Sequence, residues 1–197
     1  MAWDTERTKR LLLEAAVEEF AERGLDGASM ARIAERAGIN KERLYRYFGD
    51  KDSLFDTVLT REMDKLADAV DWPDRILQDI GEYVGRLFDY HTDHPHLVRL
   101  LLMEGLTDRA SNAAARSATY QAKVKAFEAA QQEGYLDDAI PADHLLFMLI
   151  ALTAWWSSVP QLATFLSGKS AQSKGERSRR RASVTLAAQR LALRVDS

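Results

Sequence analysis

The chain has 197 residues, of which 46% are hydrophobic and 29% are charged, a length that suits one large domain or two small ones. Lysine and arginine number 27, and aspartate and glutamate number 30. The resulting net charge of −3 excludes a polybasic nucleic-acid binder, so any such binding must come from a local patch. Cysteine is absent, which excludes disulfide scaffolds, thiolate zinc sites and cysteine nucleophiles.

Two segments bear on the location of the protein in the cell. The charged start Met1–Arg7 has no apolar segment, so we expect no signal peptide and a cytoplasmic protein. The longest apolar stretch, Leu145–Trp156, is shorter than the roughly 18 residues that a membrane-spanning helix needs. We therefore expect no membrane partner.

Long segments repeat their apolar residues at spacings of three and four, which predicts an all-α fold. A first helix is expected over 5–23, because Gly24 stands where a C-cap glycine would. Two short helices follow, one after the N-cap candidate Ser29 and one over 41–48 after the N-cap candidate Asn40. A longer helix from about residue 51 can bridge two domains, and further helices are expected over 74–92, 95–106, 111–133, 142–166 with a break near Pro160, and 177–194.

One segment of the chain is strongly basic. Between Ser167 and Arg181, six basic residues stand against Glu176 alone, a net charge of +5, and apolar residues are almost absent. This composition predicts a mobile loop that runs into the start of a helix.

The most informative segment is 29–54, where two short helices joined by a glycine turn form a helix-turn-helix. Ala34 is small enough for the second helix to pack across it, and Gly38 supplies a turn conformation that other residues reach only with strain. Four apolar residues would fill the small core against the first helix: Ile33, Ile39, Leu44 and Phe48. The outward face of the second short helix then carries Lys41, Glu42, Arg43, Tyr45, Arg46 and Tyr47.

This outward face suits a DNA groove, because its cations can contact phosphates and guanine edges and its tyrosines can contact phosphates or thymine methyl groups. Between Arg32 and Lys51, six basic residues stand against three acidic ones, a local net charge of +3 in an acidic protein. From this pattern alone, a helix-turn-helix that serves only for packing, with a solvated basic face, remains the alternative.

The segment resembles the N-terminal DNA-binding domain of the TetR/AcrR family of bacterial transcriptional regulators. The resemblance covers about residues 5–60 and runs through Ile33-Ala34, Ala37-Gly38-Ile39, Leu44-Tyr45, Tyr47-Phe48, Lys51 and Leu54-Phe55. It implies that the second short helix enters the major groove and that Lys51 contacts a phosphate. The residues assigned to the DNA-binding site on this basis are Ser29, Asn40, Lys41, Glu42, Arg43, Tyr45, Arg46, Tyr47 and Lys51.

Two positions depart from the family pattern. Asn40 stands where Ser or Thr is usual, but Asn caps a helix equally well. Glu42 stands where Gly or Pro is frequent, and its carboxylate can accept from cytosine N4 or repel a phosphate.

The resemblance divides the chain into a DNA-binding domain over 1–50 and a ligand-binding and dimerisation domain over 51–197. In the family, the last two helices form a four-helix bundle with a second subunit, which implies a homodimer. Each of these helices carries an apolar stripe: Leu145, Leu146, Leu149, Leu152 and Trp156 on the first, and Val184, Ala187, Ala188, Leu191 and Val195 on the second. The alternative is that both stripes pack only within one monomer.

Apolar and aromatic residues of the central helices are the candidates for a ligand pocket: Phe88, His91, Met103, Glu104, Tyr120, Phe127, Phe147 and Trp155. Glu104 falls on an apolar helix face, where a carboxylate needs a partner. A cationic effector could be that partner, and an intramolecular arginine such as Arg99 or Arg86 is the alternative. Aromatic residues at helical spacing can equally be core residues.

Three of the four histidines gather with two carboxylates between Asp89 and His96, so a metal site is an alternative there. His91 and His94 lie three positions apart, but Pro95 ends the helix. We interpret this run as a polar helix end and expect no metal and no cofactor.

The resemblance, together with these patterns, implies a dimeric repressor that binds a palindromic double-stranded DNA operator and is released by a small-molecule effector. An activator, or a DNA-binding protein without an effector, is the alternative. An all-α enzyme built on Glu104 and the 91–96 cluster would lack a nucleophile and a phosphate loop, so we do not expect an enzyme.

Overall fold

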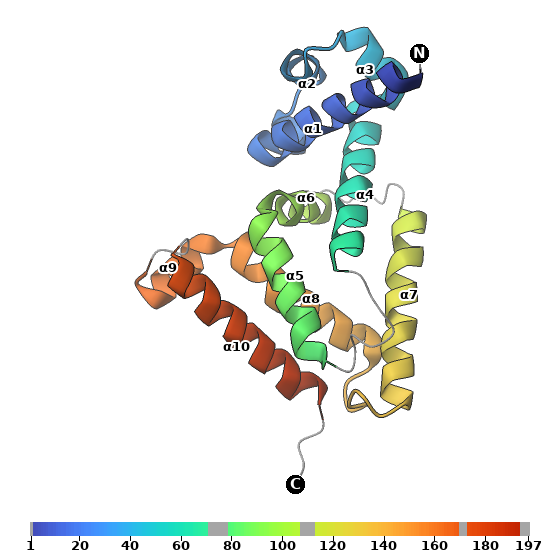
Figure 1. Cartoon of the computed structure of the whole chain (residues 1–197). Helices are drawn as coiled ribbons and strands as arrows, with labels where there is room; N and C mark the ends of the chain where they lie inside the picture. Colours follow the sequence, from blue (N-terminus) through green and yellow to red (C-terminus); the bar gives the residue numbers. More distant parts are fainter. Residues whose placement is uncertain (1, 71–78, 107–112, 170–172, 194–197) are drawn as a thin grey trace. The chain divides into compact units, whose positions relative to one another are not determined.

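The computed structural model describes residues 2–70, 79–106, 113–169 and 173–193, and the regular structure in these ranges is helical (Figure 1). The helices are α1 (Ala2–Gly27), α2 (Met30–Ala37), α3 (Lys41–Phe48), α4 (Lys51–Ala69), α5 (Ile80–Asp93), α6 (Pro95–Leu106), α7 (Ala113–Gln132), α8 (Ala142–Ser158), α9 (Pro160–Ser167) and α10 (Lys174–Ala192). The all-α prediction is confirmed. Helix α1 is longer than predicted because the chain makes a further helical turn after a kink at Gly24, where φ is +73°.

The chain forms two compact units. The first contains the described residues of Met1–Lys65 and His96–Asn112, and the second contains those of Leu66–Pro95 and Ala113–Ser197. The first unit therefore holds α1 to α3, most of α4 and almost all of α6, and the second holds α5 and α7 to α10. Helix α4 contributes to both units.

Local signals define the short helices of the first unit. Ser29 Oγ accepts a hydrogen bond from Ala31 N at 3.2 Å, and Asn40 Oδ1 accepts one from Glu42 N at 2.8 Å. Both predicted N-caps are therefore confirmed. Gly38 ends α2 in the left-handed conformation with φ +65°, which a residue with a side chain adopts only with strain.

Aromatic and aliphatic side chains fill the core of the first unit. Phe20 of α1 packs edge-on against Phe55 of α4, with ring centroids 5.2 Å apart. Of the predicted core residues of the helix-turn-helix, Ile33 and Leu44 are fully buried and the other two are half-buried. These residues identify the faces of α2 and α3 that pack against the core, and the opposite face of α3 is therefore its outward face.

The core of the second unit forms where α8 and α10 pack against α5. The two apolar stripes predicted to form a dimer interface contribute to this core within one monomer: Leu145, Leu146 and Leu149 of α8, and Val184 and Ala188 of α10. That assignment is wrong for these residues, because α5 and α7 carry apolar side chains such as Phe88 and Phe127 that the same chain must cover. Val195 lies outside the described residues.

Helices α5 and α10 lie side by side (Figure 1). Ion pairs between their side chains hold them together. Arg177 binds both carboxylate oxygens of Asp93, at 2.6 and 2.9 Å, and Arg181 Nε binds Asp89 at 2.8 Å. The hydrogen bond from Arg177 lowers the pKa of Asp93. Helix α10 starts at Lys174, so the predicted loop is wrong for residues 174–176, and the prediction that residue 177 is already helical is confirmed. The carboxylate partners of Arg177 and Arg181 lie 84 to 92 positions earlier in the sequence.

The close approach of these two helices depends on Gly85. A Cβ there would lie 2.5 Å from a terminal nitrogen of Arg181, whose guanidinium is already bound to Asp89. We expect Gly85→Val to lower the free energy of unfolding by about 1–3 kcal/mol, because the added atoms displace this guanidinium. Thermal unfolding would show this as a lower Tm. Gly105→Val on α6 is the control, since a Cβ there meets nothing within 4 Å, and equal losses in the two variants would contradict the steric explanation.

Candidate nucleic-acid interface

The outward face of α3 carries most of the residues assigned to DNA binding. Tyr47 is half-buried, and the other five are exposed: Lys41, Glu42, Arg43, Tyr45 and Arg46. The Lys41 ammonium lies 5.6 Å from the ring centroid of Tyr45, and the Arg46 guanidinium lies 5.3 Å from that of Tyr47. Within the described part of the chain, none of the three cations forms an ion pair with a carboxylate, so their charge is available to a polyanion.

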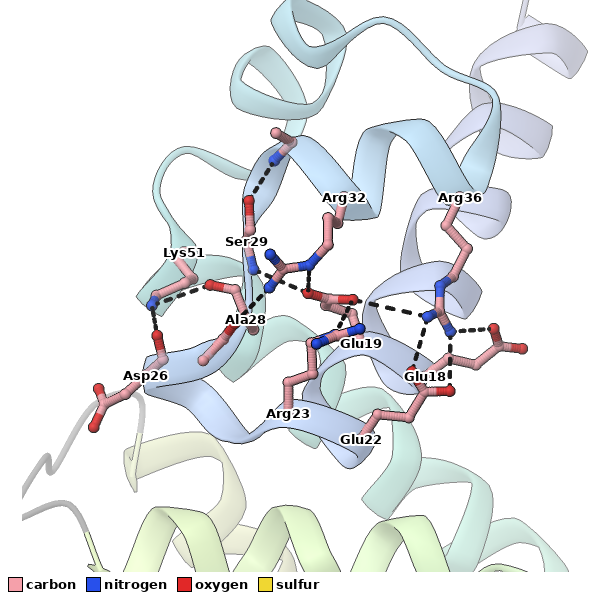
Figure 2. Close-up of polar contacts among 12 residues, drawn as sticks. Glu18, Glu19, Glu22, Arg23, Asp26, Ala28, Ser29, Arg32, Arg36 and Lys51 are labelled. Atoms are coloured by element: carbon pink, nitrogen blue, oxygen red, sulfur yellow. Dashed lines mark hydrogen bonds and ion pairs between the residues drawn. The ribbon is translucent and has the colours of Figure 1, made fainter.

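The other arginines of this segment are arranged differently (Figure 2). Arg36 pairs with three carboxylates of α1, among them Glu22 at 2.9 Å, and Arg32 binds Glu19 at 2.7 Å. The hydrogen bond from Arg36 lowers the pKa of Glu22. The local charge of +3 counts these two arginines, but carboxylates of α1 neutralise both of them within the chain.

Lys51 lies at the connection between α1 and α2 (Figure 2). Its Nζ is 3.4 Å from the carbonyl oxygen of Asp26 and 3.5 Å from that of Ala28, the residue before Ser29. The structure thus brings Lys51 close to the N-cap of α2. The remaining predicted contacts lie on α3 or, in the case of Asn40, at its N-cap.

Sequence reasoning missed Glu19, a carboxylate of α1 with no exposed surface. Its Oε1 accepts from Arg32 Nε at 2.7 Å and from the backbone N–H of Ser29 at 3.2 Å. The signal was its position, four residues after the buried Ala15 and on the stripe that α1 turns to the core. A carboxylate on such a stripe needs a partner.

The residues assigned to a ligand pocket fall into three groups. Four are fully buried or half-buried in the second unit: Phe88, His91, Phe127 and Tyr120. Two are half-buried on α6, in the first unit: Met103 and Glu104. The last two, Phe147 and Trp155, are 73% and 55% exposed, because α8 turns its other face to the core. Arg86, one expected partner of Glu104, pairs with Glu82 at 2.9 Å.

His91 occupies a buried, hydrogen-bonded position. Its Nδ1 lies 3.1 Å from Thr153 Oγ1, and its carbonyl oxygen accepts from Ser157 Oγ at 2.9 Å. Burial lowers the pKa of His91 to about 4, so the imidazole is neutral at neutral pH. No group of three metal-ligating side chains occurs among the described residues. In the same residues no single helix is long and apolar enough to cross a membrane, and α8 with α9, which together reach that length, are bent by 82°.

A hollow with a volume of about 140 Å³ lies between α8, α9 and α10. It is lined by Trp156, Ala163, Leu166, Ser167, Glu176, Arg179, Arg180 and Ser183, and by none of the predicted pocket residues. Glu176 pairs with Arg179 at 3.1 Å and with Lys169 at 3.2 Å, and the Arg180 guanidinium lies 5.2 Å from the centroid of the Trp156 ring. The carboxylate of this hollow is thus neutralised within the chain.

A second buried carboxylate, Glu62 of α4, connects α4 to α6 within the first unit. Its two oxygens lie 2.6 Å from Lys65 Nζ and 2.9 Å from His96 Nε2. Burial raises the pKa of Glu62, but the hydrogen bonds and charges of His96 and Lys65 outweigh burial and lower the pKa to about 2.

We expect this site to make the protein less stable in acid. Because the folded-state pKa of Glu62 lies below its unfolded value, the carboxylate stabilises the fold fully above about pH 5 and less as the pH falls towards 2. Thermal unfolding at about pH 5 and pH 3 measures the effect, and Glu62→Gln is expected to lose less stability over this interval than the wild type, by roughly 2 kcal/mol. Glu6→Gln, at an exposed position, is the control. If both variants lost as much stability between about pH 5 and pH 3 as the wild type, the role of Glu62 in acid sensitivity would be refuted.

A capped helix-turn-helix whose second helix carries cations without ion pairs among the described residues, followed by a helical second unit, defines a DNA-binding transcriptional regulator. Residues 12–58 match the bacterial regulatory proteins of the tetR family, and residues 79–190 match the tetracyclin repressor-like C-terminal domain. The chain therefore belongs to the TetR family of transcriptional regulators, as the resemblance implied. This is a family of regulators rather than enzymes.

Individual relatives extend over most of the chain. The HTH-type transcriptional repressor SCO4008 of Streptomyces coelicolor is 44% identical over 171 residues, which cover 85% of this chain and 87% of that protein. The HTH-type transcriptional repressor NicS of Pseudomonas putida is 29% identical over 171 residues, which cover 80% of this chain and 79% of that protein. The crystal structure of SCO4942 from Streptomyces coelicolor has a TM-score of 0.79 at 30% identity and covers 95% of this chain and 99% of that one.

Proposed function

We propose that this TetR-family protein is a dimeric repressor that binds a palindromic operator and leaves it when a small-molecule effector binds. The observation that carries the proposal is the outward face of α3. Its cations Lys41, Arg43 and Arg46 form no ion pair with the described residues, and Lys41 and Arg46 lie over tyrosine rings. SCO4008 and NicS, which resemble the chain along most of its length, are both named transcriptional repressors.

In this proposal α3 enters the major groove, since the second helix of a helix-turn-helix reads base edges while the first crosses the DNA backbone. The α3 cations contact phosphates and guanine edges, and the tyrosines contact phosphates or thymine methyl groups. Ser29 and Lys51 bind phosphate next to the start of α2, and Asn40 caps α3. Glu42, at the start of α3, is placed to accept from a cytosine N4.

A homodimer through α8 and α10 accounts for large apolar side chains that the monomer leaves exposed. Phe147, Met148 and Trp155 are exposed on α8, and Leu186 is exposed on α10. Phe147 and Trp155 are eight positions apart and so lie close to one face of α8. Their exposure favours a role in the dimer interface over one in a ligand pocket. The two α3 helices would then read half-sites roughly 34–36 Å apart, or a multiple of that distance.

The effector is proposed to bind in the C-terminal domain, residues 51–197, near the buried residues Phe88, His91 and Phe127 and the half-buried Tyr120. Helix α4 contributes to both units, so a shift of α4 would carry the change to the DNA-binding domain, residues 1–50. A coupling free energy of about 1–3 kcal/mol would weaken operator binding by roughly 5- to 150-fold.

Fluorescence polarisation with DNA from upstream of the protein's own gene tests this function. We expect binding that survives an excess of competitor DNA and is released by one member of a compound library. Weak binding that salt abolishes entirely would contradict a repressor at this promoter, because non-specific phosphate contacts behave in that way. Specific binding that no compound releases would favour a regulator without an effector, and a footprint upstream of the promoter would favour an activator.

A further inference from the structure

We propose that Glu19 is a positioning residue for DNA binding: it holds the first turn of α2, with the N-cap Ser29, in the place from which Ser29 contacts a phosphate. The proposal rests on the proposed role of Ser29 at the DNA backbone. Glu19 has no exposed surface, so its carboxylate is out of reach of a bound DNA. Its action is therefore on the geometry of α2.

Donors and cations surround the Glu19 carboxylate (Figure 2). Oε1 accepts from Arg32 Nε at 2.7 Å and from Ser29 N at 3.2 Å. Oε2 lies 3.6 Å from Arg23 Nε and 3.8 Å from a terminal nitrogen of Arg36. A carboxylate without contact to water is tolerated because such groups compensate for its lost hydration.

The two oxygens of Glu19 have different surroundings. Both of its hydrogen bonds fall on Oε1, whereas Oε2 is buried and has only the longer ion-pair contacts. The hydrogen bonds are thus directed at the cap and first turn of α2. A carboxylate that served only to neutralise the surrounding arginines would not need this bias.

The contacts of Glu19 fix both ends of the first turn of α2. Ser29 donates its backbone N–H to Glu19 while its Oγ accepts from Ala31 N as the N-cap. Arg32, one turn later, binds Glu19 through Nε and the carbonyl oxygen of Gly27 through a terminal nitrogen. The Glu19 carboxylate therefore joins the start of α2 to α1, and Arg32 adds a second link to the last residue of α1.

Lys51 depends on the same connection, because its Nζ lies 3.4 Å from Asp26 O and 3.5 Å from Ala28 O. The two groups proposed to bind phosphate outside α3, Ser29 and Lys51, are thus both attached to the segment that Glu19 holds. Phosphate contacts set the register of a DNA-binding protein on the duplex. A displaced cap is expected to weaken these contacts even when the fold is intact.

Glu19→Gln tests the proposal against the matched control Glu22→Gln. Both variants remove one negative charge from α1 and one carboxylate that binds an arginine of α2, but Glu22 is exposed and binds Arg36 in the last turn of α2. The probe is a fluorescent duplex of random sequence at low salt, where phosphate contacts dominate binding. We expect Glu19→Gln to lose about tenfold in affinity and Glu22→Gln to lose less than about twofold.

A double-mutant cycle with Ser29→Ala separates positioning from simple folding. If Glu19 acts through the cap, Glu19→Gln costs little further affinity once Ser29 Oγ is gone, so the two losses are not additive. If Glu19 had a purely structural role, Glu19→Gln would lower the Tm. At temperatures well below the Tm, it would then either leave the DNA affinity unchanged or lower it additively with Ser29→Ala. If Glu19→Gln does not fold, Arg32→Ala takes its place with the same expectation, because the Arg32 side chain is 42% exposed.

Equal affinities of Glu19→Gln and Glu22→Gln, or additive losses with Ser29→Ala, would overturn the positioning role. Failure of the proposed function has a different signature. In that case the wild-type protein would show no preference for any operator over the random duplex, while the comparison of the variants on that duplex would still report on Glu19.

Discussion

Lys51→Ala and Tyr47→Ala are each expected to lower operator affinity by about ten- to a hundredfold and to leave the proposed dimer intact. Lys51 Nζ is held beside the start of α2 by two carbonyl oxygens and is proposed to bind a phosphate there. The ring of Tyr47 supports the Arg46 guanidinium at 5.3 Å, so its loss removes both a contact and the orientation of a cation. Polarisation titrations measure the affinity, and sedimentation measures the oligomeric state.

Arg36→Ala is the matched control for Lys51→Ala, because each removes one positive charge from the same segment. Arg36 already pairs with Glu18 and Glu22 at 2.9 Å, so it contributes little to the field that DNA meets. We expect a change of less than about twofold in operator affinity. An equal loss in Arg36→Ala and Lys51→Ala would mean that net charge rather than position sets the affinity.

Phe147→Glu and Trp155→Glu are expected to convert the proposed dimer to monomers. Both side chains are more than half exposed in the monomer, and a second copy would have to bury a carboxylate without a partner. Operator affinity should fall by at least about a hundredfold, because two linked recognition helices bind with an effective concentration that separate monomers lack. Sedimentation velocity and polarisation titrations on the same samples measure both effects.

Tyr135→Glu is the control for these variants, since Tyr135 is an exposed aromatic residue that lies between α7 and α8 rather than on the proposed interface. This variant is expected to remain dimeric and to bind DNA as the wild type does. A dimer that persists in Phe147→Glu and Trp155→Glu would place the interface elsewhere on the molecule.

Signals within a few residues were enough to predict the helix-turn-helix. The caps at Ser29 and Asn40 bind backbone groups two positions away, and Gly38 needs only its own left-handed conformation. The burial of Leu44 follows from the period of the helix. The sequence by itself thus determined the all-α fold, the family and the residues on the outward face of α3.

Pairings between distant residues were decided only by the tertiary structure. An apolar stripe predicts that a helix face is buried, but burial is non-directional and does not specify the partner. The stripe containing Leu149 therefore predicts a contact with a second subunit as readily as one within the chain, and in the structure Leu149 packs in the core of its own chain. The sequence does not specify the partner of a charge either. Arg177 binds Asp93, which lies 84 positions away in the sequence, and Arg32 binds Glu19, which lies 13 positions away. Which apolar faces stay exposed for a partner, and which cations stay free for DNA, depends on groups that only folding brings together.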